Sequence, residues 1–396
     1  MQEKFDIVVV GAGLVGLTAA LACAKKGAKV CILDQKKPNI KEDKRASAIS
    51  ASSFVLLKKL GVTDFLVSNI QAIDKILISD SRVGRKNKFN LKFQNLNYKG
   101  YMIDNSILKN ELLKLIKKSH GITLKAPVKI LKTFTNSDKV KINLDNNRII
   151  EASLLVAADG KNSNFRKSAD ISVRFTHYRQ SAIVTTIGHE FVHNGSAHQF
   201  FFPGGPLALL PLTKNRSSIV WSDSSLASDA AMSLNDSDFI DELSHRINGL
   251  LGKIKLLGPR QIFPLNLQMA NRYTAKRLVL VGDAAHSIHP IAGQGLNLGL
   301  RDAAALADNV ELSIRENIDL GSEVIQEYEK WRISDNNKLG ITTDILNRLF
   351  SNKNSSLRFV RRLGLNGVNH SELLKTFFIE EASGLTGELP TLMIEN

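Results

Sequence analysis

Three glycines close to the N-terminus have the spacing of a loop that binds a dinucleotide. Residues 7–16 read IVVVGAGLVG, so Gly11, Gly13 and Gly16 directly follow a run of β-branched residues. In such a loop the first glycine permits a tight turn, the second lets the backbone approach a pyrophosphate, and the third lets a helix pack on a strand. The pattern predicts that the unpaired N–H groups at the start of the following helix face a phosphate.

An acidic residue completes this pattern. We expect a strand over 5–10, a helix over 17–26 and a second strand over 29–33, with Gly27 ending the helix. Asp34 follows the second strand, where its carboxylate can accept hydrogen bonds from ribose hydroxyls. This acid favours an adenosine ribose with a free 2′-hydroxyl, as in FAD or NAD, over a 2′-phosphate. The alternative is a structural βαβ turn that binds no ligand.

Two later segments also run from an apolar strand into an aspartate. The sequence LLVAADG ends in Asp159 and Gly160, and the sequence RLVLVGD ends in Gly282 and Asp283. Carboxylates at the C-terminal ends of strands point into the crevice where open α/β sheets bind ligands. Asp283 is therefore a candidate to accept hydrogen bonds from the ribityl hydroxyls of a flavin. Each acid alone is more typical of a turn or cap, but three such segments in one chain favour ligand binding.

A second glycine-rich run follows Asp283. Gly293, Gly295 and Asn297 open a helix of small and apolar residues that we expect to extend through Ala307. The two glycines would let backbone N–H groups come close to the pyrophosphate or the ring of a flavin. All three residues are candidate cofactor-binding residues.

The motifs together resemble the FAD-dependent aromatic monooxygenases of the para-hydroxybenzoate hydroxylase fold, and within them the UbiH/UbiF/VisC family of ubiquinone-biosynthesis hydroxylases. The resemblance extends along most of the chain, and its most specific part is the block 277–306. The segments that carry it are GAGLVG at 11–16, DKRASAIS at 43–50, GYMIDN at 100–105, LLVAADGKNSNFRK at 154–167, AHQFFFPGGPLALLP at 197–211 and RLVLVGDAAHSIHPIAGQGLNLGLRDAAAL at 277–306.

The resemblance implies FAD as the bound cofactor. By this resemblance the first glycine motif and Asp34 hold the ADP half, and Asp283 holds the ribityl side. Arg45 matches an arginine that contacts the flavin, while Asp159 and Gly160 match a motif linked to both FAD and NAD(P)H binding. Because the chain has one complete glycine-rich fingerprint, we expect NAD(P)H to bind transiently, without a domain of its own.

The resemblance also implies an activity. It is hydroxylation of the aromatic ring of a polyprenyl phenol or quinol in ubiquinone biosynthesis, with NAD(P)H and O₂, through a C4a-hydroperoxyflavin. The protein would orient the substrate and exclude water, while the cofactor supplies the chemistry. No side-chain base is required, and we identify none. We favour packed, hydrogen-bonded roles for His286 and His289, with His289 and Pro290 near the flavin ring as the alternative.

Two other functions stay open at this point. One is a flavoenzyme of the same fold with different chemistry, such as a small-phenol hydroxylase, an epoxidase or an isoprenoid reductase. The other is a flavin-loaded scaffold subunit of a membrane-associated quinone-synthesis complex. Oxygen uptake with formation of a hydroxylated product would distinguish a hydroxylase from a reductase.

The spread of the motifs predicts a discontinuous α/β architecture. We expect a Rossmann-like FAD-binding domain, an inserted substrate domain built on an antiparallel sheet, and a C-terminal helical region. Strand-like segments run through the larger insertion, and Phe200, Phe201, Phe202 and Trp221 in it are core residues or pocket-lining residues. The expected boundaries are 1–71, 99–173 and 269–330 for the first domain, 72–98 and 174–268 for the second, and 331–396 for the helical region.

Composition excludes several other classes of protein. The 396 residues exceed what one core usually organises, and 43% hydrophobic with 23% charged residues is typical of a globular protein. Cys23 and Cys31 lie in apolar runs, so we expect two buried thiols in a reducing, cytoplasmic compartment. We expect no metal site. Residues 7–24 carry no charge, but their three glycines favour a strand, turn and helix over a membrane span.

The net charge of +15 does not by itself identify a partner. The basic clusters 82–88 and 358–362 lack a nucleic-acid motif, and we expect no nucleic-acid partner. Residues 323–381 have helical spacing, which favours helices docked on the FAD domain; contact with an anionic membrane or a partner protein is the alternative. Because a polyprenyl substrate resides in a bilayer, peripheral association with the inner face of the membrane, or with a ubiquinone-biosynthesis complex, is part of the prediction.

Overall fold

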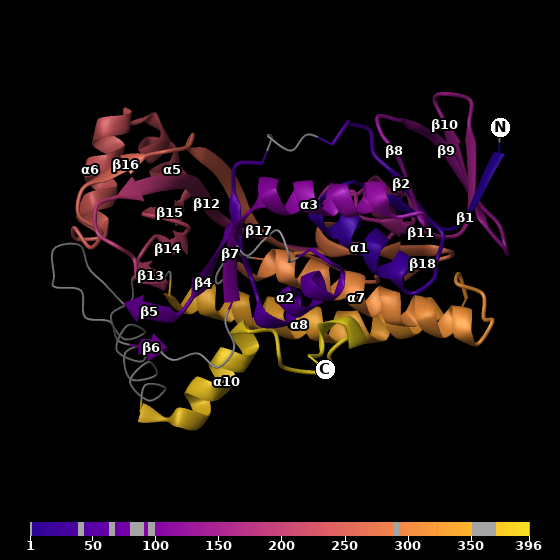
Figure 1. Ribbon diagram of the computed structural model, residues 1–396. Coiled ribbons are helices and arrows are strands. Elements are labelled where there is room, and N and C mark those ends of the chain that lie inside the picture. The colour runs from indigo at the N-terminus through magenta and orange to yellow at the C-terminus, as the bar shows by residue number, and fades with distance from the viewer. Residues whose placement is uncertain are drawn as a thin grey trace.

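Two large sheets lie side by side in the molecule, each covered by helices (Figure 1). The sheets belong to a computed structural model, and their arrangement confirms the predicted α/β fold class. The residues that the structure describes are 2–38, 43–62, 68–79, 91–93, 100–288, 293–322, 324–350 and 370–395.

The first sheet has eight strands, and its centre is parallel. Its middle strand pairs in parallel with a neighbour on each side, and Ile7, Val8 and Val9 on it are fully buried because helices cover the sheet. The parallel strands, in spatial order, are β19 (Leu278–Leu280), β11 (Ile149–Ala157), β1 (Gln2–Val10), β2 (Val30–Leu33) and β8 (Ile122–Lys125). Antiparallel strands complete it: β18 (Thr274–Ala275), β9 (Ile130–Thr135) and β10 (Val140–Leu144).

The N-terminal βαβ unit is confirmed, with shifted boundaries. Helix α1 (Leu14–Lys25) begins three residues earlier than predicted, because the turn is complete at Gly13, whose carbonyl accepts from the Leu17 N–H at 2.9 Å. The helix ends before Gly27, which has φ +100° as a helix-terminating glycine should. Helices α3 (Asn105–Lys118) and α7 (Gln294–Arg315) pack beside α1, and α7 extends beyond the expected Ala307.

The second sheet has nine strands and is mainly antiparallel, as expected. Two of its strands, from the segment 75–93, join it at one edge, where β5 pairs in parallel with β13. Its members, in spatial order, are β20 (His286–Ser287), β17 (Gln261–Ala270), β12 (Val173–His189), β15 (Arg216–Ser224), β14 (Gly205–Leu212), β13 (Ser196–Phe202), β5 (Lys75–Ser79) and β6 (Leu91–Phe93), with β16 (Ile254–Leu256) beside β12.

One face of this second sheet is an ordinary core. Phe200, Phe202 and Trp221 are buried there against helix α6 (Asp236–Arg246), near α5 (Ser225–Ser233). Because successive side chains of a strand alternate, Phe201 points to the other face. The core interpretation is therefore confirmed for three of these four aromatic residues, and only Phe201 lines a cavity.

A small sheet and several helices close the gap between the two large sheets. The small sheet has the order β3 (Ala46–Ile49), β7 (Gly100–Asp104) and β4 (Ile70–Ile73), and helix α2 (Ala51–Lys59) follows β3. Helix α8 (Val324–Phe350) packs on α7, and α10 (Glu372–Ala382) lies apart from α8 toward the second sheet (Figure 1). Helices η1 (Gly282–Ala284), α4 (Asn164–Ser168) and η3 (Thr391–Met393) are short.

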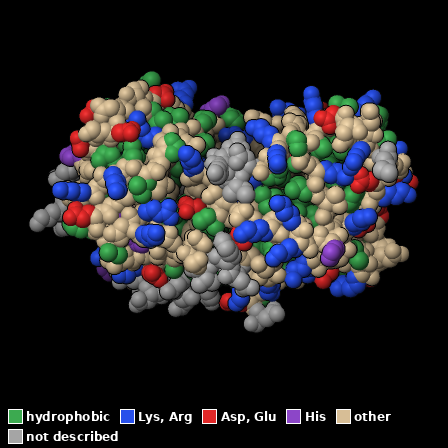
Figure 2. Space-filling view, turned by 45° about the horizontal axis from the view of Figure 1, so that its top comes forward, with side chains coloured by type: hydrophobic (Ala, Val, Ile, Leu, Met, Phe, Trp, Pro, Cys, Tyr) green, Lys and Arg blue, Asp and Glu red, His purple; other side chains and the backbone are tan. Residues whose placement is uncertain are grey.

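Several composition-based expectations can be compared with the structure. Cys23 and Cys31 are free and buried. No helix in the described part of the chain is long and apolar enough to span a bilayer. On the face in Figure 2, lysines and arginines are spread over both halves, with acidic side chains between them. The basic clusters 82–88 and 358–362, and residues His289 and Pro290, lie outside the described residues.

Candidate functional site

The three glycines of the first loop have different surroundings. A Cβ at Gly11, where φ is +113°, would lie 2.3 Å from the Ala158 carbonyl oxygen, and a Cβ at Gly16 would lie 2.0 Å from the Gly11 carbonyl oxygen. Both glycines are therefore required by packing within the protein. A Cβ at Gly13 would meet no atom within 4 Å, so the loop is open at its second glycine. This space above the start of α1 is where a pyrophosphate would approach the helix N-terminus.

Two of the predicted carboxylates follow β2 and β11, the strands on either side of β1. Asp34 accepts from the Ala12 N–H at 2.6 Å and from the Lys36 N–H at 2.8 Å, so it is anchored beside the glycine loop. The Oδ2 atom of Asp159 accepts from the Asn164 N–H at 2.9 Å, whereas its Oδ1 atom is buried and has no hydrogen-bond partner in the described part of the chain. A buried acceptor without a partner is costly unless a ligand or water donates to it. These carboxylates fit a ligand that carries hydroxyl groups.

The third predicted carboxylate, Asp283, lies in the η1 turn at the cavity. Its surface is open to the cavity, while protein surrounds it on the other sides. This enclosure raises the pKa of Asp283, against the opposing effects of His286, Arg45 and Lys161. The carboxylate therefore gains from donors that a ligand brings, such as sugar-alcohol hydroxyls.

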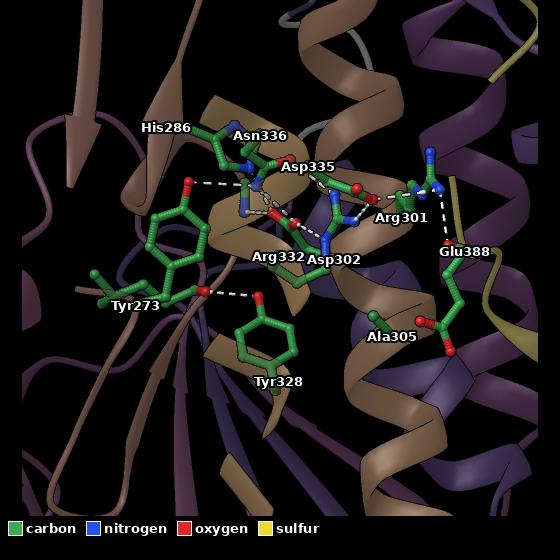
Figure 3. Close-up of polar contacts among 12 residues, drawn as sticks. Tyr273, His286, Arg301, Asp302, Ala305, Tyr328, Arg332, Asp335, Asn336 and Glu388 are labelled. Carbon is green, nitrogen blue, oxygen red and sulfur yellow. Dashed lines mark hydrogen bonds and ion pairs between the residues drawn. The ribbon is translucent and has the colours of Figure 1, made fainter. Parts of the chain in front are cut away.

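A buried network behind this turn holds it in place (Figure 3). Asp302 of α7 is fully buried, and its Oδ2 atom accepts from the Gly282 N–H at 3.0 Å and contacts His286 Nε2 at 2.6 Å. Its Oδ1 atom accepts from Arg332 Nε at 2.8 Å and from Asn336 Nδ2 at 3.2 Å. Burial alone would raise the pKa of Asp302, but His286 and Arg332 hold it well below its usual range. The favoured role for His286, a packed and hydrogen-bonded histidine, is confirmed.

The network continues from α8 to the C-terminal segment. Asp335 accepts from Arg332 at 2.8 Å and contacts Arg301 at 3.3 Å, and Arg301 donates to the carbonyls of Thr386 and Glu388, each at 2.8 Å. Figure 3 shows this path running from His286 to Glu388 across α7 and α8. The η1 turn, two helices and the C-terminal segment are thus joined through consecutive ion pairs and hydrogen bonds.

The C-terminal segment also closes the cavity directly. Gln294 Nε2 donates to the Ala382 carbonyl at 3.1 Å, and the Ser52 N–H donates to the Ser383 carbonyl at 3.2 Å. Ala382 and Ser383 line the cavity themselves. The end of α10 is therefore part of the cavity wall.

Arg45 and Asn297 secure the side of the cavity formed by β3. Arg45 binds Asp43 through two hydrogen bonds of 2.8 Å, and its guanidinium lies 5.2 Å from the centre of the Phe263 ring. The Asn297 amide accepts from the Ser50 N–H at 2.9 Å and donates to the Ala48 carbonyl at 2.9 Å. The side chain of Asn297 therefore ties the start of α7 to β3.

Most of the predicted residues line one of two hollows at this end of the first sheet. The larger group surrounds a cavity of about 1060 Å³ between the two sheets: Gly13, Gly16, Arg45, Gly160, Asp283, Gly293, Gly295 and Asn297. The smaller group lines the neighbouring hollow: Gly11, Asp34 and Asp159. Gly282 lies behind Asp283, with φ +59°.

Reasoning from the sequence missed three residues that hold the site together. Arg166 is buried, and it donates to the Ala284 carbonyl at 2.8 Å and to the Lys161 carbonyl at 2.9 Å, so it joins two motif loops. Asp302 and Arg332 were not singled out either. The signal for Asp302 was its place in the run NLGLRD, but nothing in the sequence names Arg332 as its partner.

Comparison with protein families matches residues 4–334 to a family described as an FAD binding domain. The chain belongs to this family. It is 39% identical to the ubiquinone hydroxylase UbiL of Rhodospirillum rubrum, over 98% of this chain and 92% of that protein. It is 33% identical to the 3-demethoxyubiquinol 3-hydroxylase of Escherichia coli, over 97% of this chain and 100% of that protein. The resemblance to the UbiH/UbiF/VisC family is thereby confirmed.

Solved structures share the fold. The p-nitrophenol 4-monooxygenase PnpA of Pseudomonas putida superposes with a TM-score of 0.82 at 18% identity, over 97% of this chain and 99% of that one. HpxO of Klebsiella pneumoniae, solved with FAD and uric acid, superposes with a TM-score of 0.76 at 17% identity, over 96% of each chain. The predicted cofactor, FAD, is confirmed. When bound, FAD supplies transfer of electrons from NAD(P)H and reaction with O₂.

Proposed function

We propose that this protein is a monooxygenase that hydroxylates the aromatic ring of a polyprenyl phenol or quinol in ubiquinone biosynthesis, with NAD(P)H and O₂ as co-substrates. The observation that carries the proposal is the composition of the cavity between the sheets. One side holds the predicted flavin residues, and the other side is an apolar wall of the second sheet. The names of the two relatives above, both hydroxylases of ubiquinone compounds, support the substrate class.

The predicted cofactor-binding residues can be assigned roles on this proposal. The open loop at Gly13 and the N-terminus of α1 bind the pyrophosphate, and Asp34 binds the adenosine ribose. Asp283 accepts from the ribityl chain, and the N–H groups near Gly293 and Gly295 face the flavin ring. Arg45, held by Asp43, contributes a cation at the cavity, where it contacts the flavin.

The rest of the chain excludes water and orients the substrate. The apolar wall includes Ile76, Ile78, Leu91, Phe93 and Phe201. We assign substrate binding to 72–98 and 174–268, FAD binding to 1–71, 99–173 and 269–330, and closure of the cavity to 331–396. An apolar wall of this kind favours a ligand with a large hydrocarbon part, since apolar pockets with few polar groups bind such ligands.

Contact with a membrane surface belongs to the same proposal. Phe378 and Ile379 of α10 line the cavity, while Phe377 beside them is 54% exposed. A polyprenyl substrate dissolved in a bilayer would enter most directly where exposed apolar residues adjoin the cavity. We therefore assign α10 to the face that meets the lipid. Co-sedimentation with anionic vesicles tests this, and wild-type binding equal to that of a Phe377→Ser variant contradicts it.

The decisive experiment is turnover by the purified, FAD-loaded protein. A prenylated phenol should stimulate NAD(P)H oxidation, and mass spectrometry should find one oxygen atom from ¹⁸O₂ in the product. Oxidation of NAD(P)H with reduction of the substrate and no oxygen incorporation would instead identify a reductase. Absence of any substrate-dependent oxidation would refute the proposal.

A further inference from the structure

Gln199 is a polar side chain within the apolar wall that faces the predicted flavin residues. Gln199 lies at the middle of β13, with Ala208 of β14 as its cross-strand partner on one side and Ile78 of β5 on the other. The same row continues to Val220 of β15 and to Leu91 of β6. All five residues line the cavity. Across this row, therefore, Gln199 is the one residue that can form hydrogen bonds through its side chain.

The residues above and below Gln199 on its own strand leave room for a ligand. Side chains alternate along a strand, so Ala197 and Phe201 share the face of Gln199. Both line the cavity, and Ala197 and Ala208 carry only a methyl group next to the longer glutamine. With alanines at two of its neighbouring positions, the Gln199 amide has room to reach a ligand in the cavity.

The neighbouring histidine adds no charge to this wall. His198 lies between Ala197 and Gln199, and its ring is stacked with Phe200 of the opposite face, at 6.2 Å and 8°. Burial lowers the pKa of His198 to about 4, so the ring is neutral at pH 7. His198 therefore adds no charge to the row around Gln199, and in an apolar environment a single hydrogen bond discriminates strongly between ligands.

A glutamine amide in this position has the chemistry to recognise a phenol. Its oxygen can accept from a ring hydroxyl, and its NH₂ group can donate to a ring oxygen substituent. A pocket that is mostly apolar fixes the orientation of its ligand through a few such groups. A site that hydrogen-bonds a substrate hydroxyl also rejects analogues that lack it, because the buried polar group is then left unpaired.

We propose that Gln199 is a specificity-determining residue that hydrogen-bonds the ring hydroxyl of the aromatic substrate and thereby sets which ring carbon faces the flavin. The inference rests on the proposed function, since it concerns the same cavity and substrate class. It adds the group that recognises the aromatic ring, whereas the apolar wall binds the hydrocarbon part of the substrate. The predicted flavin residues lie on the other side of the cavity, so a change at position 199 should leave FAD affinity within about twofold.

The test compares two ligands and three proteins. The ligands are 2-geranylphenol and its O-methyl ether, which lacks the hydroxyl proton; binding is followed by the change in flavin absorbance of the FAD-loaded protein. Wild type should prefer the phenol by about tenfold or more, and Gln199→Met, which has a similar shape without an amide, should prefer it by less than about threefold. Val220→Leu is the matched control, because it changes the volume of the same row and should shift both affinities alike.

A second readout separates recognition from a role in packing alone. Gln199→Met should give hydroxylation at more than one ring position, with more NAD(P)H consumed per product, while its FAD affinity and unfolding midpoint stay near wild type. Gln199→Leu should behave in the same way, which guards against a folding defect particular to one variant. Retention of the full preference for the phenol in both variants would overturn the role of Gln199 and leave the proposed function standing. Failure of wild type to bind either ligand or to turn over the phenol would overturn both.

Discussion

The carboxylate of Asp302 accepts a hydrogen bond from the Gly282 N–H at 3.0 Å, so the turn that carries Asp283 is fixed to helix α7. Asp302 and Asp283 lie within one motif, yet their environments are opposite. His286 and Arg332 surround Asp302 and keep it ionised, whereas Asp283 is open to the cavity and its pKa is raised. Asp302 therefore stabilises the fold, and Asp283 is available to a ligand.

Replacing Asp302 by asparagine should lower the free energy of unfolding by about 3 kcal/mol, because the buried Arg332 guanidinium loses its counter-charge. Urea unfolding of the apoprotein measures this loss. Asp335→Asn is the control: it also contacts Arg332 but is partly exposed, so the expected loss is about 1 kcal/mol. Equal stability of wild type and Asp302→Asn would contradict the role of the network.

The same variant should change the dependence of stability on pH. The pKa of Asp302 is lower in the folded than in the unfolded state, so its contribution is fully present above the unfolded value, about pH 4, and is lost as the pH falls further. Wild type should therefore lose stability below about pH 4 more steeply than Asp302→Asn. Parallel curves for the two proteins would show that Asp302 does not contribute through its charge.

Replacing Asp283 by asparagine should weaken FAD binding without lowering the stability of the apoprotein. FAD affinity should fall by about tenfold, since an amide oxygen is a weaker acceptor than a carboxylate. The stability of the apoprotein should not fall, because the raised pKa shows that the ionised form is disfavoured in the folded state. The free-energy cost of ionising Asp283 in the folded state is absent at low pH and grows as the pH rises through its folded pKa. The asparagine variant removes this cost. Fluorescence titration with FAD and urea unfolding at two pH values measure both effects; unchanged FAD affinity would remove Asp283 from the binding site.

Two alanine variants separate the ligand-facing glycine from a packing glycine. Gly13→Ala should leave apoprotein stability within about 0.5 kcal/mol, because its φ of −78° suits alanine and its Cβ meets nothing, but should weaken FAD binding by about tenfold or more. Gly16→Ala should cost about 3 kcal/mol, since its Cβ would overlap the Gly11 carbonyl. Calorimetry of each apoprotein, without and with added FAD, measures the change in stability and the change in FAD affinity. Tight FAD binding by Gly13→Ala would place the pyrophosphate elsewhere.

Both thiols should be unreactive in the native protein. Burial raises the pKa of Cys23 and of Cys31 to about 12, so almost no thiolate is present at pH 8. A chromogenic disulfide reagent should label neither residue until guanidinium unfolds the chain, and then should label both. Fast labelling of one thiol in the native state would show that α1 or β2 opens locally.

Local patterns in the sequence predicted the parts of the site that depend on neighbouring residues. The spacing of Gly11, Gly13 and Gly16 and the distance to Asp34 lie within one βαβ unit, where strand, turn and helix follow each other along the chain. The strands of the second sheet were also visible, because alternation of apolar residues is a local property. The predicted start of α1 was wrong by three residues, because the sequence does not show where the glycine turn ends.

Contacts between distant residues could not be predicted. Asp302 and Arg332 are 30 positions apart on different helices, and their pairing depends on the angle at which α8 packs on α7. Arg166 joins two loops whose proximity arises only after the first sheet has formed. The pairing of β5 with β13 likewise depends on the tertiary fold, since more than 100 residues separate the two strands.

The hydrogen bonds of Ala382 with Gln294 and of Ser383 with Ser52 close the cavity, and they can form only late in synthesis of the chain. A ribosome makes the chain from its N-terminus, so these two residues emerge after every other wall of the cavity. Both glycine-rich loops leave the ribosome while the chamber they face is still open to solvent. We therefore expect stable capture of the cofactor only after α10 has been made, and a nascent chain stalled before α10 should hold its flavin loosely.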